Sequence, residues 1–253
     1  MLNIDIVPCL QDNYSFVIHD TKTDIVAVVD PSEFEPINNF IEKKFKKIDY
    51  ILNTHHHFDH TGGNLRLKKK YKTKIIGSKK DEKRIPGIDI TLSDNENFKL
   101  GNIDFKTFLI PGHTIGHICF YSKNEKVIFT GDTLFSLGCG RVFEGTHQEM
   151  LGSLNLIKKL PLDTQIYCGH EYTQKNLDFC SKYEISNDLT EREKCITTRL
   201  NLKQPTIPTT LGLELNTNIF LRCDNSKVKK SLDMENSTEL EVFKKLRDLK
   251  DVF

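Results

Sequence analysis

Short apolar and β-branched runs alternate with Gly, Pro, Asn and Asp residues over the first two thirds of the chain. Each run predicts a strand, and the runs are IDIVP, YSFVIHD, DIVAVVD, DYILNT, TKIIGS, IDFKTFLI, HICFYS, KVIFTGD and TQIYCG. Helical periodicity lies between some of them, at residues 33–46, 63–71 and 147–159. This alternation predicts an α+β domain with two sheets or one large sheet.

The pattern changes after about residue 172. The segments TQKNLDFCSKY and DLTEREKCITTRLNLK predict helices, and the second begins with Asp188 and Glu191 at capping-box spacing. A Pro-containing connection, QPTIPTTLGLELNTN, leads to a last helix that begins with Thr238 and Glu241 at the same spacing. That helix carries one apolar stripe, made of Val242, Leu246, Leu249 and Phe253. We therefore expect two domains, an αβ domain over residues 1–172 and a smaller helical domain over residues 173–253.

Charge and composition exclude several kinds of partner. The 36 basic and 35 acidic residues leave a net charge of +1, so no overall field draws the protein to nucleic acid or to a membrane. The lysine-rich segments KKFKK and LKKKYKTK are interleaved with apolar residues at helical spacing, which predicts solvated helix faces. We expect neither a nucleic-acid partner nor a membrane partner.

The cysteines and the N-terminal segment indicate the compartment. The seven cysteines are an odd number without a C-x-x-C pair, which favours reduced and mostly buried thiols. The start MLNIDIVPCL has no basic leader followed by an apolar core, and the run IVAVV is too short to cross a bilayer. We expect a cytoplasmic protein that is a monomer.

Metal-ligand residue types gather at the ends of the predicted strands. The motif THHHFDH follows the strand DYILNT, and three further residues of this kind follow FLIPG, VIFTG and IYCG. Because the ends of neighbouring strands meet on one edge of a layered αβ protein, we expect these side chains to come together. Five imidazoles and two carboxylates are too many for one tetrahedral ion and suit two ions. The seven candidate ligands are His55, His57, Asp59, His60, His113, Asp132 and His170.

The spacing within the motif divides the ligands. Alternate residues of an extended segment point the same way, so His55 and His57 can bind one ion. Asp59 and His60, past the bend, can bind the other, and Asp132 is the natural bridge between the ions. The remaining histidines are interpreted as structural or surface residues: His19, His56, His117 and His147. Among them, His117 follows GHTIG and is placed to support a metal ligand.

The quoted motifs resemble those of the metallo-β-lactamase-fold hydrolases and, more narrowly, the glyoxalase II (hydroxyacylglutathione hydrolase) family. The segments concerned are THHHFDH, PGHTIGH, FTGDTLF, GCGR, FEGT and CGHEYT, with TNIFLR and RDLKDVF near the C-terminus. The resemblance implies an αββα sandwich followed by a helical domain that completes the substrate site. It implies one ion on His55, His57 and His113, the other on Asp59, His60 and His170, and Asp132 shared. Asp59 and Asp132 are the carboxylates assigned to catalysis.

The same resemblance implies a reaction. A hydroxide bridging two divalent ions would hydrolyse S-(2-hydroxyacyl)glutathione thioesters, for example S-D-lactoylglutathione, in the second step of methylglyoxal detoxification. The expected ions are zinc, with iron or manganese as alternatives, because a nitrogen and oxygen ligand set accepts each of them. The glutathione thiol has a pKa of about 8.5 and can depart as a thiolate without a strong general acid.

Basic and aromatic residues are the candidates for substrate binding. Arg247 and Lys250 stand at i and i+3 on the last helix, so both can meet one carboxylate. The resemblance implies that they bind the glycine carboxylate of glutathione. It implies further glutathione contacts at Arg141, Phe143 and Tyr172, and Phe143 stands where some family members carry Tyr.

Other functions are also compatible with the fold. A glutathione persulfide dioxygenase with a single iron shares it, but the C-terminal helical segment and the basic RDLKD end argue against that enzyme. A nucleolytic relative would need a broad basic stripe with interleaved aromatic residues, which the sequence lacks. A non-catalytic metal-binding protein would normally have lost a ligand, and all seven are present.

Overall fold

The computed structural model describes residues 1–253, which form two compact units. Unit 1 comprises Met1–Ile110 and Ile115–Gly131, and unit 2 comprises Pro111–Thr114 and Asp132–Phe253. No helix is both long enough and apolar enough to cross a membrane.

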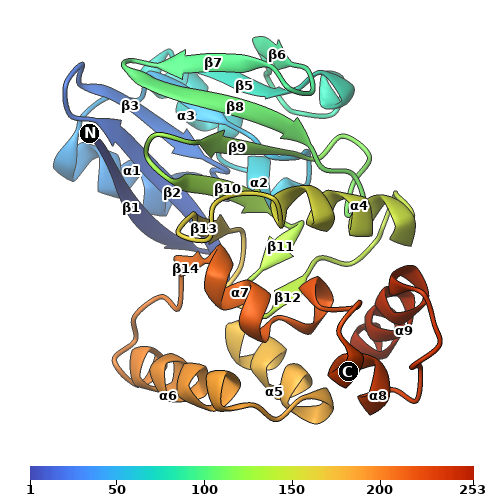
Figure 1. The fold of residues 1–253 in the computed structure, drawn as a ribbon. Coiled ribbons are helices and arrows are strands. Elements are labelled where there is room, and N and C mark those ends of the chain that lie inside the picture. The colour runs from blue at the N-terminus through green and yellow to red at the C-terminus, as the bar shows by residue number, and fades with distance from the viewer. The chain divides into compact units, whose positions relative to one another are not determined.

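Unit 1 contains a mixed sheet whose strands are ordered β1-β2-β3-β4-β5-β6 (Figure 1). The first three strands pair antiparallel, whereas β3 to β6 are parallel to one another. The C-terminal ends of β3, β4 and β5 therefore lie at one edge of the sheet, and the segments that follow them are neighbours. The strands are β1 (Leu2–Cys9), β2 (Asn13–Asp20), β3 (Ile25–Val29), β4 (Tyr50–Leu52), β5 (Lys74–Ser78) and β6 (Ile90–Leu92).

Helices cover one face of this sheet. Ile37 and Ile41 of α1 (Phe34–Lys44) and Leu67 of α3 (Asn64–Tyr71) are buried against alternate residues of the strands, among them Val28 and Ile51. Burial of these side chains removes apolar surface from water and is the main stabilising term of the layer. It fixes the sheet edge from which residues 54–60, called the ligand loop below, emerge.

The other face of the sheet packs on a second set of strands. These strands pair antiparallel in the order β10-β9-β8-β7. Phe16 of β2 lies against Phe129 of β10, with ring centroids 5.4 Å apart. Unit 1 is thus a layer of helices, a mixed sheet and an antiparallel set of strands. The second set is β7 (Asn97–Leu100), β8 (Ile103–Leu109), β9 (Ile118–Ser122) and β10 (Val127–Gly131).

Unit 2 is mainly helical. Aromatic rings pack at its centre: Phe179 stacks on Phe220 with centroids 5.9 Å apart, and Phe220 meets Phe243 edge to face at 6.2 Å. Two short strand pairs, β11 (Leu134–Phe135) with β12 (Gly138–Cys139) and β13 (Gln165–Cys168) with β14 (Thr209–Thr210), complete the unit. The helices are α4 (His147–Ile157), α5 (Thr173–Tyr183), α6 (Asn187–Asn201), α7 (Leu211–Thr217), α8 (Ser226–Ser231) and α9 (Glu239–Asp251).

Most predicted elements are confirmed. All nine predicted strands form, and so do the helices predicted before and after residue 172. The prediction for the cysteines is also confirmed, because all seven are free and only Cys195 is exposed. The last helix has the predicted capping box, in which Thr238 and Glu241 satisfy each other's backbone N–H groups.

Three details of the C-terminal part were predicted wrongly. The second helix begins at Asn187 with Ser186 as its cap, not with Asp188, because the Ser186 hydroxyl accepts a hydrogen bond from the Leu189 N–H at 3.2 Å. The segment predicted as a connection contains α7. The last helix ends at Asp251, so Phe253 lies beyond it and is 50% exposed, while Phe243 joins the buried face.

The helix layer of unit 1 gives a first prediction. Ile41→Ala removes a fully buried side chain and should lower the free energy of unfolding by about 2–5 kcal/mol. The matched control Ile185→Ala changes a side chain that is 93% exposed, and should change it by less than about 0.5 kcal/mol. Urea unfolding followed by circular dichroism measures both. Equal shifts in the two variants would show that α1 does not seal this core.

Candidate metal centre

The ligand loop of unit 1 is anchored by the backbone around it. It follows β4 and enters α2 (Phe58–Thr61), which places Asp59 and His60 in the first helical turn. The Asn53 side chain donates a hydrogen bond of 2.9 Å to the His60 carbonyl, and the Ile118 N–H donates one of 2.9 Å to the Thr54 carbonyl. Both ends of the loop are therefore held, the His60 end by Asn53 after β4 and the Thr54 end by Ile118 of β9.

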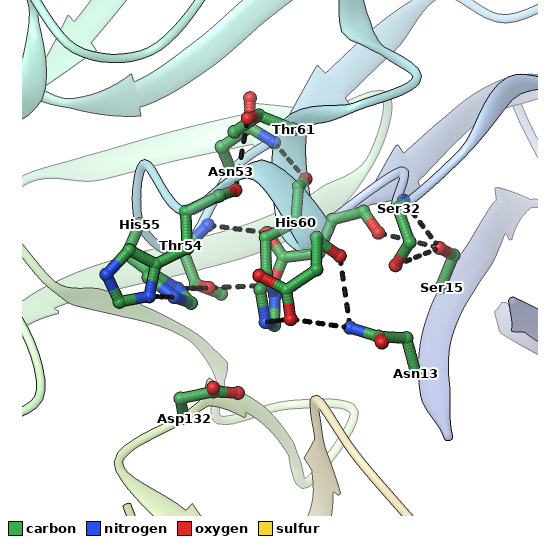
Figure 2. Close-up of polar contacts among 12 residues, drawn as sticks. Asn13, Ser15, Ser32, Asn53, Thr54, His55, His60, Thr61 and Asp132 are labelled. Carbon is green, nitrogen blue, oxygen red and sulfur yellow. Dashed lines mark hydrogen bonds and ion pairs between the residues drawn. The ribbon is translucent and has the colours of Figure 1, made fainter. Parts of the chain in front are cut away.

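Asp30, at the end of β3, orients the loop from within. Its carboxylate accepts hydrogen bonds from the Thr54 N–H at 2.8 Å, the Thr54 hydroxyl at 2.6 Å and His60 Nδ1 at 3.0 Å. The residue is only 2% exposed. Figure 2 labels Thr54 and His60 and marks hydrogen bonds and ion pairs with dashed lines. Since His60 Nδ1 carries the proton, its Nε2 keeps a lone pair for a metal ion.

The same carboxylate sets the tautomer of His55. The Thr54 hydroxyl donates a hydrogen bond to Asp30, so its oxygen accepts one from His55 Nδ1, 3.1 Å away. His55 Nε2 then faces His57 Nδ1 at 3.1 Å. Two nitrogens that bind one tetrahedral ion at about 2.0–2.1 Å lie roughly 3.3 Å apart, so this pair fits a shared cation.

His55 is also packed tightly on its faces. The His117 ring stacks on it with centroids 4.6 Å apart and an interplanar angle of 17°. Gly131 lies on the same side, with φ +46°, and a Cβ atom there would come within 2.4 Å of the Thr54 hydroxyl. Only glycine allows this approach. His117 therefore supports a candidate ligand, whereas His19 pairs with Asp24 at 3.0 Å, away from the loop.

Asp59 supplies a carboxylate to the loop. Asn13 Nδ2 donates to Asp59 Oδ2 at 3.0 Å and to its carbonyl at 3.1 Å (Figure 2). This places Asp59 Oδ2 3.7 Å from His60 Nε2. The donor atoms of Asp30, His55 and His60 also lie within 4.8 Å of one another. Three hydrogen bonds occupy most of the acceptor sites of the Asp30 carboxylate, and through them Asp30 orients the other two residues.

Unit 2 has its own cluster of donors. Asp132 Oδ2 lies 3.4 Å from His113 Nε2 and 3.2 Å from His170 Nε2. His113 Nδ1 donates to the Arg141 carbonyl at 2.9 Å, which leaves Nε2 as the acceptor. All three ligand candidates are at least 94% buried. A carboxylate oxygen that lies between two imidazole nitrogens can serve as a ligand shared by two cations.

Two candidate substrate residues flank this cluster within unit 2. The Tyr172 ring stacks on His170 with centroids 4.7 Å apart and an interplanar angle of 4°. The Phe143 ring lies 5.1 Å from His113 and the residue is 61% exposed. An exposed apolar ring next to a buried ligand can cover a bound molecule.

The three basic candidates in unit 2 already have partners. Arg247 is 3% exposed and donates to Asp251 Oδ1 at 2.9 and 3.1 Å, and to the Cys139 carbonyl at 2.8 Å. Arg141 Nε lies 3.3 Å from the same Asp251 oxygen. Lys250 donates to the Lys175 carbonyl at 2.8 Å. Burial lowers the pKa of Lys250 to about 8, with nearby Arg247 acting in the same direction.

Sequence reasoning missed Asp30, Thr54 and Asn13. Asp30 carries the same signal as Asp132, because each directly follows an apolar strand. Unlike the predicted candidates, Asp30 has no histidine or glycine beside it in the sequence. Asn13 lies at the start of β2, where nothing in the residue pattern distinguishes it.

Comparison with known proteins gives the class of the fold. Residues 8–170 match the family model of the metallo-beta-lactamase superfamily. The crystal structure of the BLEG-1 B3 metallo-beta-lactamase has a TM-score of 0.66 and 22% identity, covering 87% of this chain and 99% of that chain. The structure of ETHE1 from Myxococcus xanthus has a TM-score of 0.68 and 18% identity, covering 98% and 90%. These likenesses show the metallo-beta-lactamase fold, as predicted.

The rest of the chain narrows the class. Residues 171–253 match the family model of the hydroxyacylglutathione hydrolase C-terminus. Curated hydroxyacylglutathione hydrolases from Pelagibacter ubique and Methylococcus capsulatus are 51% and 40% identical to this chain. The alignments cover all of this chain and 100% and 99% of those proteins. The chain belongs to the hydroxyacylglutathione hydrolase family of the metallo-beta-lactamase superfamily.

Asp30 gives a prediction for the metal centre. Asp30→Asn replaces an acceptor of three hydrogen bonds and frees the tautomers of His55 and His60, so divalent-ion affinity should fall by about 10–100-fold. Asp104→Asn, on an exposed side chain of β8, is the control. Zinc competition against a chromophoric chelator measures both. Unchanged affinity in Asp30→Asn would show that this carboxylate does not orient the ligands.

Proposed function

We propose that the chain hydrolyses S-(2-hydroxyacyl)glutathione thioesters, converting S-D-lactoylglutathione and water into glutathione and D-lactate. The observation that carries the proposal is the full-length similarity to hydroxyacylglutathione hydrolases, which includes the C-terminal family model. That segment, residues 171–253, matches the model of the hydroxyacylglutathione hydrolase C-terminus. The water oxygen joins the acyl carbon, the carbon–sulfur bond breaks, and sulfur leaves as the glutathione thiolate.

The proposed cofactors are two divalent metal ions. One would be held by His55, His57 and His113, the other by Asp59, His60 and His170, with Asp132 shared. Support comes from the hydrogen bonds that leave an acceptor nitrogen on His55, His60 and His113. Zinc is the proposed metal, with iron or manganese as alternatives for such a nitrogen and oxygen set. When bound, such ions lower the pKa of water toward about 7 and polarise a carbonyl.

Hydrogen bonds within the chain hold the candidate metal-ligand histidines in place, so these histidines are not available to protonate the leaving group. Asp30, Thr54 and the Arg141 carbonyl hold ligand histidines in one tautomer, so these imidazoles are committed to metal. A thioester suits such a site, because a thiol of pKa about 8.5 leaves as a thiolate without protonation.

Glutathione recognition is proposed for the residues that flank the donors of unit 2. Glutathione carries two carboxylates, and Arg141, Arg247 and Lys250 are cations that can bind them. Tyr172 and Phe143 would make further contacts with glutathione, next to His170 and His113. Phe143 has no hydroxyl, so the contact there would be apolar.

The arrangement of functions along the chain is also a proposal. Residues 1–172 would carry the metal ligands, and residues 173–253 would provide most of the cationic substrate site. Seven free cysteines fit a reducing compartment, so the cytoplasm is proposed. The proposed active form is the monomer.

The activity can be tested directly. Purified protein should hydrolyse S-D-lactoylglutathione, followed as loss of thioester absorbance, and a chelator should abolish the reaction reversibly. Added zinc, iron or manganese should restore it. Absence of metal-dependent turnover would refute the proposal, and oxygen consumption with glutathione persulfide would favour the dioxygenase instead.

Lys250 predicts a pH dependence. Its pKa of about 8 means that its charge is lost as the pH rises through 8, whereas it is charged below 7. The kcat/KM value, which reports the free enzyme, should fall above pH 8 through a rise in KM. Lys250→Arg stays charged and should remove this loss, while Lys245→Arg, exposed on the same helix, should not. If kcat/KM falls above pH 8 to the same extent in the wild type, Lys250→Arg and Lys245→Arg, Lys250 is not the source of the pH dependence.

A further inference from the structure

Asp81 lies at the sheet edge that carries the ligand loop. β4 and β5 are parallel neighbours, and the Asn53 N–H donates to the Ile76 carbonyl at 2.9 Å just where they end. The segment after β4 is the ligand loop. The segment after β5 is a short 3-10 helix, η1 (Lys79–Asp81). Strand pairing alone therefore brings Asp81 next to the loop.

A turn and a guanidinium fix the position of the Asp81 side chain. The Asp81 carbonyl accepts hydrogen bonds from the N–H groups of Arg84 at 2.8 Å and Ile85 at 2.9 Å. Arg84 donates from Nε, at 3.1 Å, and from a terminal nitrogen to the same oxygen, Oδ1. Asp81 is fully buried. A charge at such a depth is costly unless it is paired, so this pair is rigidly set.

Asp81 and Arg84 together hold His56, the histidine between the two candidate ligands. Arg84 can only donate, so His56 Nε2, 3.4 Å from the guanidinium, is an acceptor. The proton of His56 is therefore on Nδ1, which faces Asp81 Oδ2 at 3.4 Å. The His56 ring therefore lies between Arg84, at its Nε2, and Asp81, at its Nδ1. Its backbone then fixes the directions in which His55 and His57 leave the chain.

Asp81 also contacts a second segment that supports His55. A Cβ atom on Gly116 would lie 1.9 Å from Asp81 Oδ1 and 2.3 Å from its Cγ. The carboxylate thus packs directly on the backbone at residue 116. The next residue is His117, whose ring stacks on His55. One buried carboxylate reaches His55 from two sides, through His56 and through Gly116.

We propose that Asp81 is a positioning residue for the cation held by His55 and His57, acting through His56 and the Gly116–His117 segment. The inference rests on the proposed metal centre. It assigns a role to a residue that would touch neither the ion nor the substrate. It also explains why a histidine stands at position 56, although His56 is not among the proposed ligands.

The primary test is the isosteric variant Asp81→Asn. It weakens the pair with Arg84 and should lower the affinity for one of the two cations by about 10–100-fold, with the other cation retained. Metal content after dialysis against a graded chelator should therefore fall toward one ion per chain. The visible absorption of the cobalt-loaded protein should change, which a purely structural role would not cause. Asp104→Asn, exposed on β8, is the control.

A second variant reaches the same carboxylate without altering any polar group. Gly116→Ala puts a methyl group where Asp81 Oδ1 lies and should reproduce the loss of one cation. Gly152→Ala, in α4 with nothing within 4 Å of the added methyl, is its control. The double variant Asp81→Asn with Gly116→Ala should bind no more weakly than the worse single variant, because both act on one contact. Urea unfolding of each metal-free protein checks the fold.

The outcomes separate this inference from the proposed function. Loss of one cation in both variants, with the controls unchanged, supports the inference. Two cations at wild-type affinity in both variants would overturn it and leave the proposed function intact. Equal loss of both cations would also overturn it, since that indicates a general effect on the fold. A wild-type protein that binds no cation would refute the proposed function, and the inference with it.

Discussion

The hydrogen bonds that converge on the Asp30 carboxylate are the interaction on which the ligand loop depends. Parallel pairing of β3 and β4 sets Val29 opposite Leu52, and the Asp30 N–H donates to the Leu52 carbonyl at 2.8 Å. This pairing brings the carboxylate within reach of Thr54 and His60. A buried carboxylate is stable only when its oxygens are satisfied, so loop and carboxylate stabilise each other. The orientation of the candidate metal ligands follows from a strand register.

Arg141 plays a comparable part in unit 2. Its carbonyl accepts the Nδ1 proton of His113, and its guanidinium lies against Asp251. The residue therefore links a candidate metal ligand with the cations proposed to bind glutathione. Arg247 shares the same Asp251 oxygen. In this structure the Asp251 carboxylate is the counter-ion of two residues proposed to receive a carboxylate of the substrate.

Apolar runs and strand ends made most of the fold and the candidate ligands predictable from sequence. β6 and β7 were missed because short apolar stretches there are interrupted by charged and turn-forming residues, as in DITLSDNENFKL. α7 was missed because two prolines precede it in the segment read as a connection. Phe253 has the right spacing for the last helix, but that helix ends two residues earlier.

The supporting residues were harder to predict than the ligands. Asp30, Asp81 and Asn13 act through hydrogen bonds across strands, and such contacts depend on register and on the path of turns. Histidine clustering gives no information about them. Asp30 was nevertheless within reach, because it follows an apolar strand just as Asp132 does. The path of the chain after β5, which brings Asp81 to His56, is visible only in the folded structure.

Anomalous X-ray scattering from crystals of the metal-loaded protein tests the account most directly. Two anomalous peaks per chain are expected. One should lie within about 2.0–2.1 Å of His55 Nε2 and His57 Nδ1, and the other at a similar distance from His60 Nε2. His55 and His60 should keep their Nδ1 contacts with Thr54 and Asp30. Peaks elsewhere in the molecule, or no peak at the ligand loop of fully loaded protein, would contradict the account.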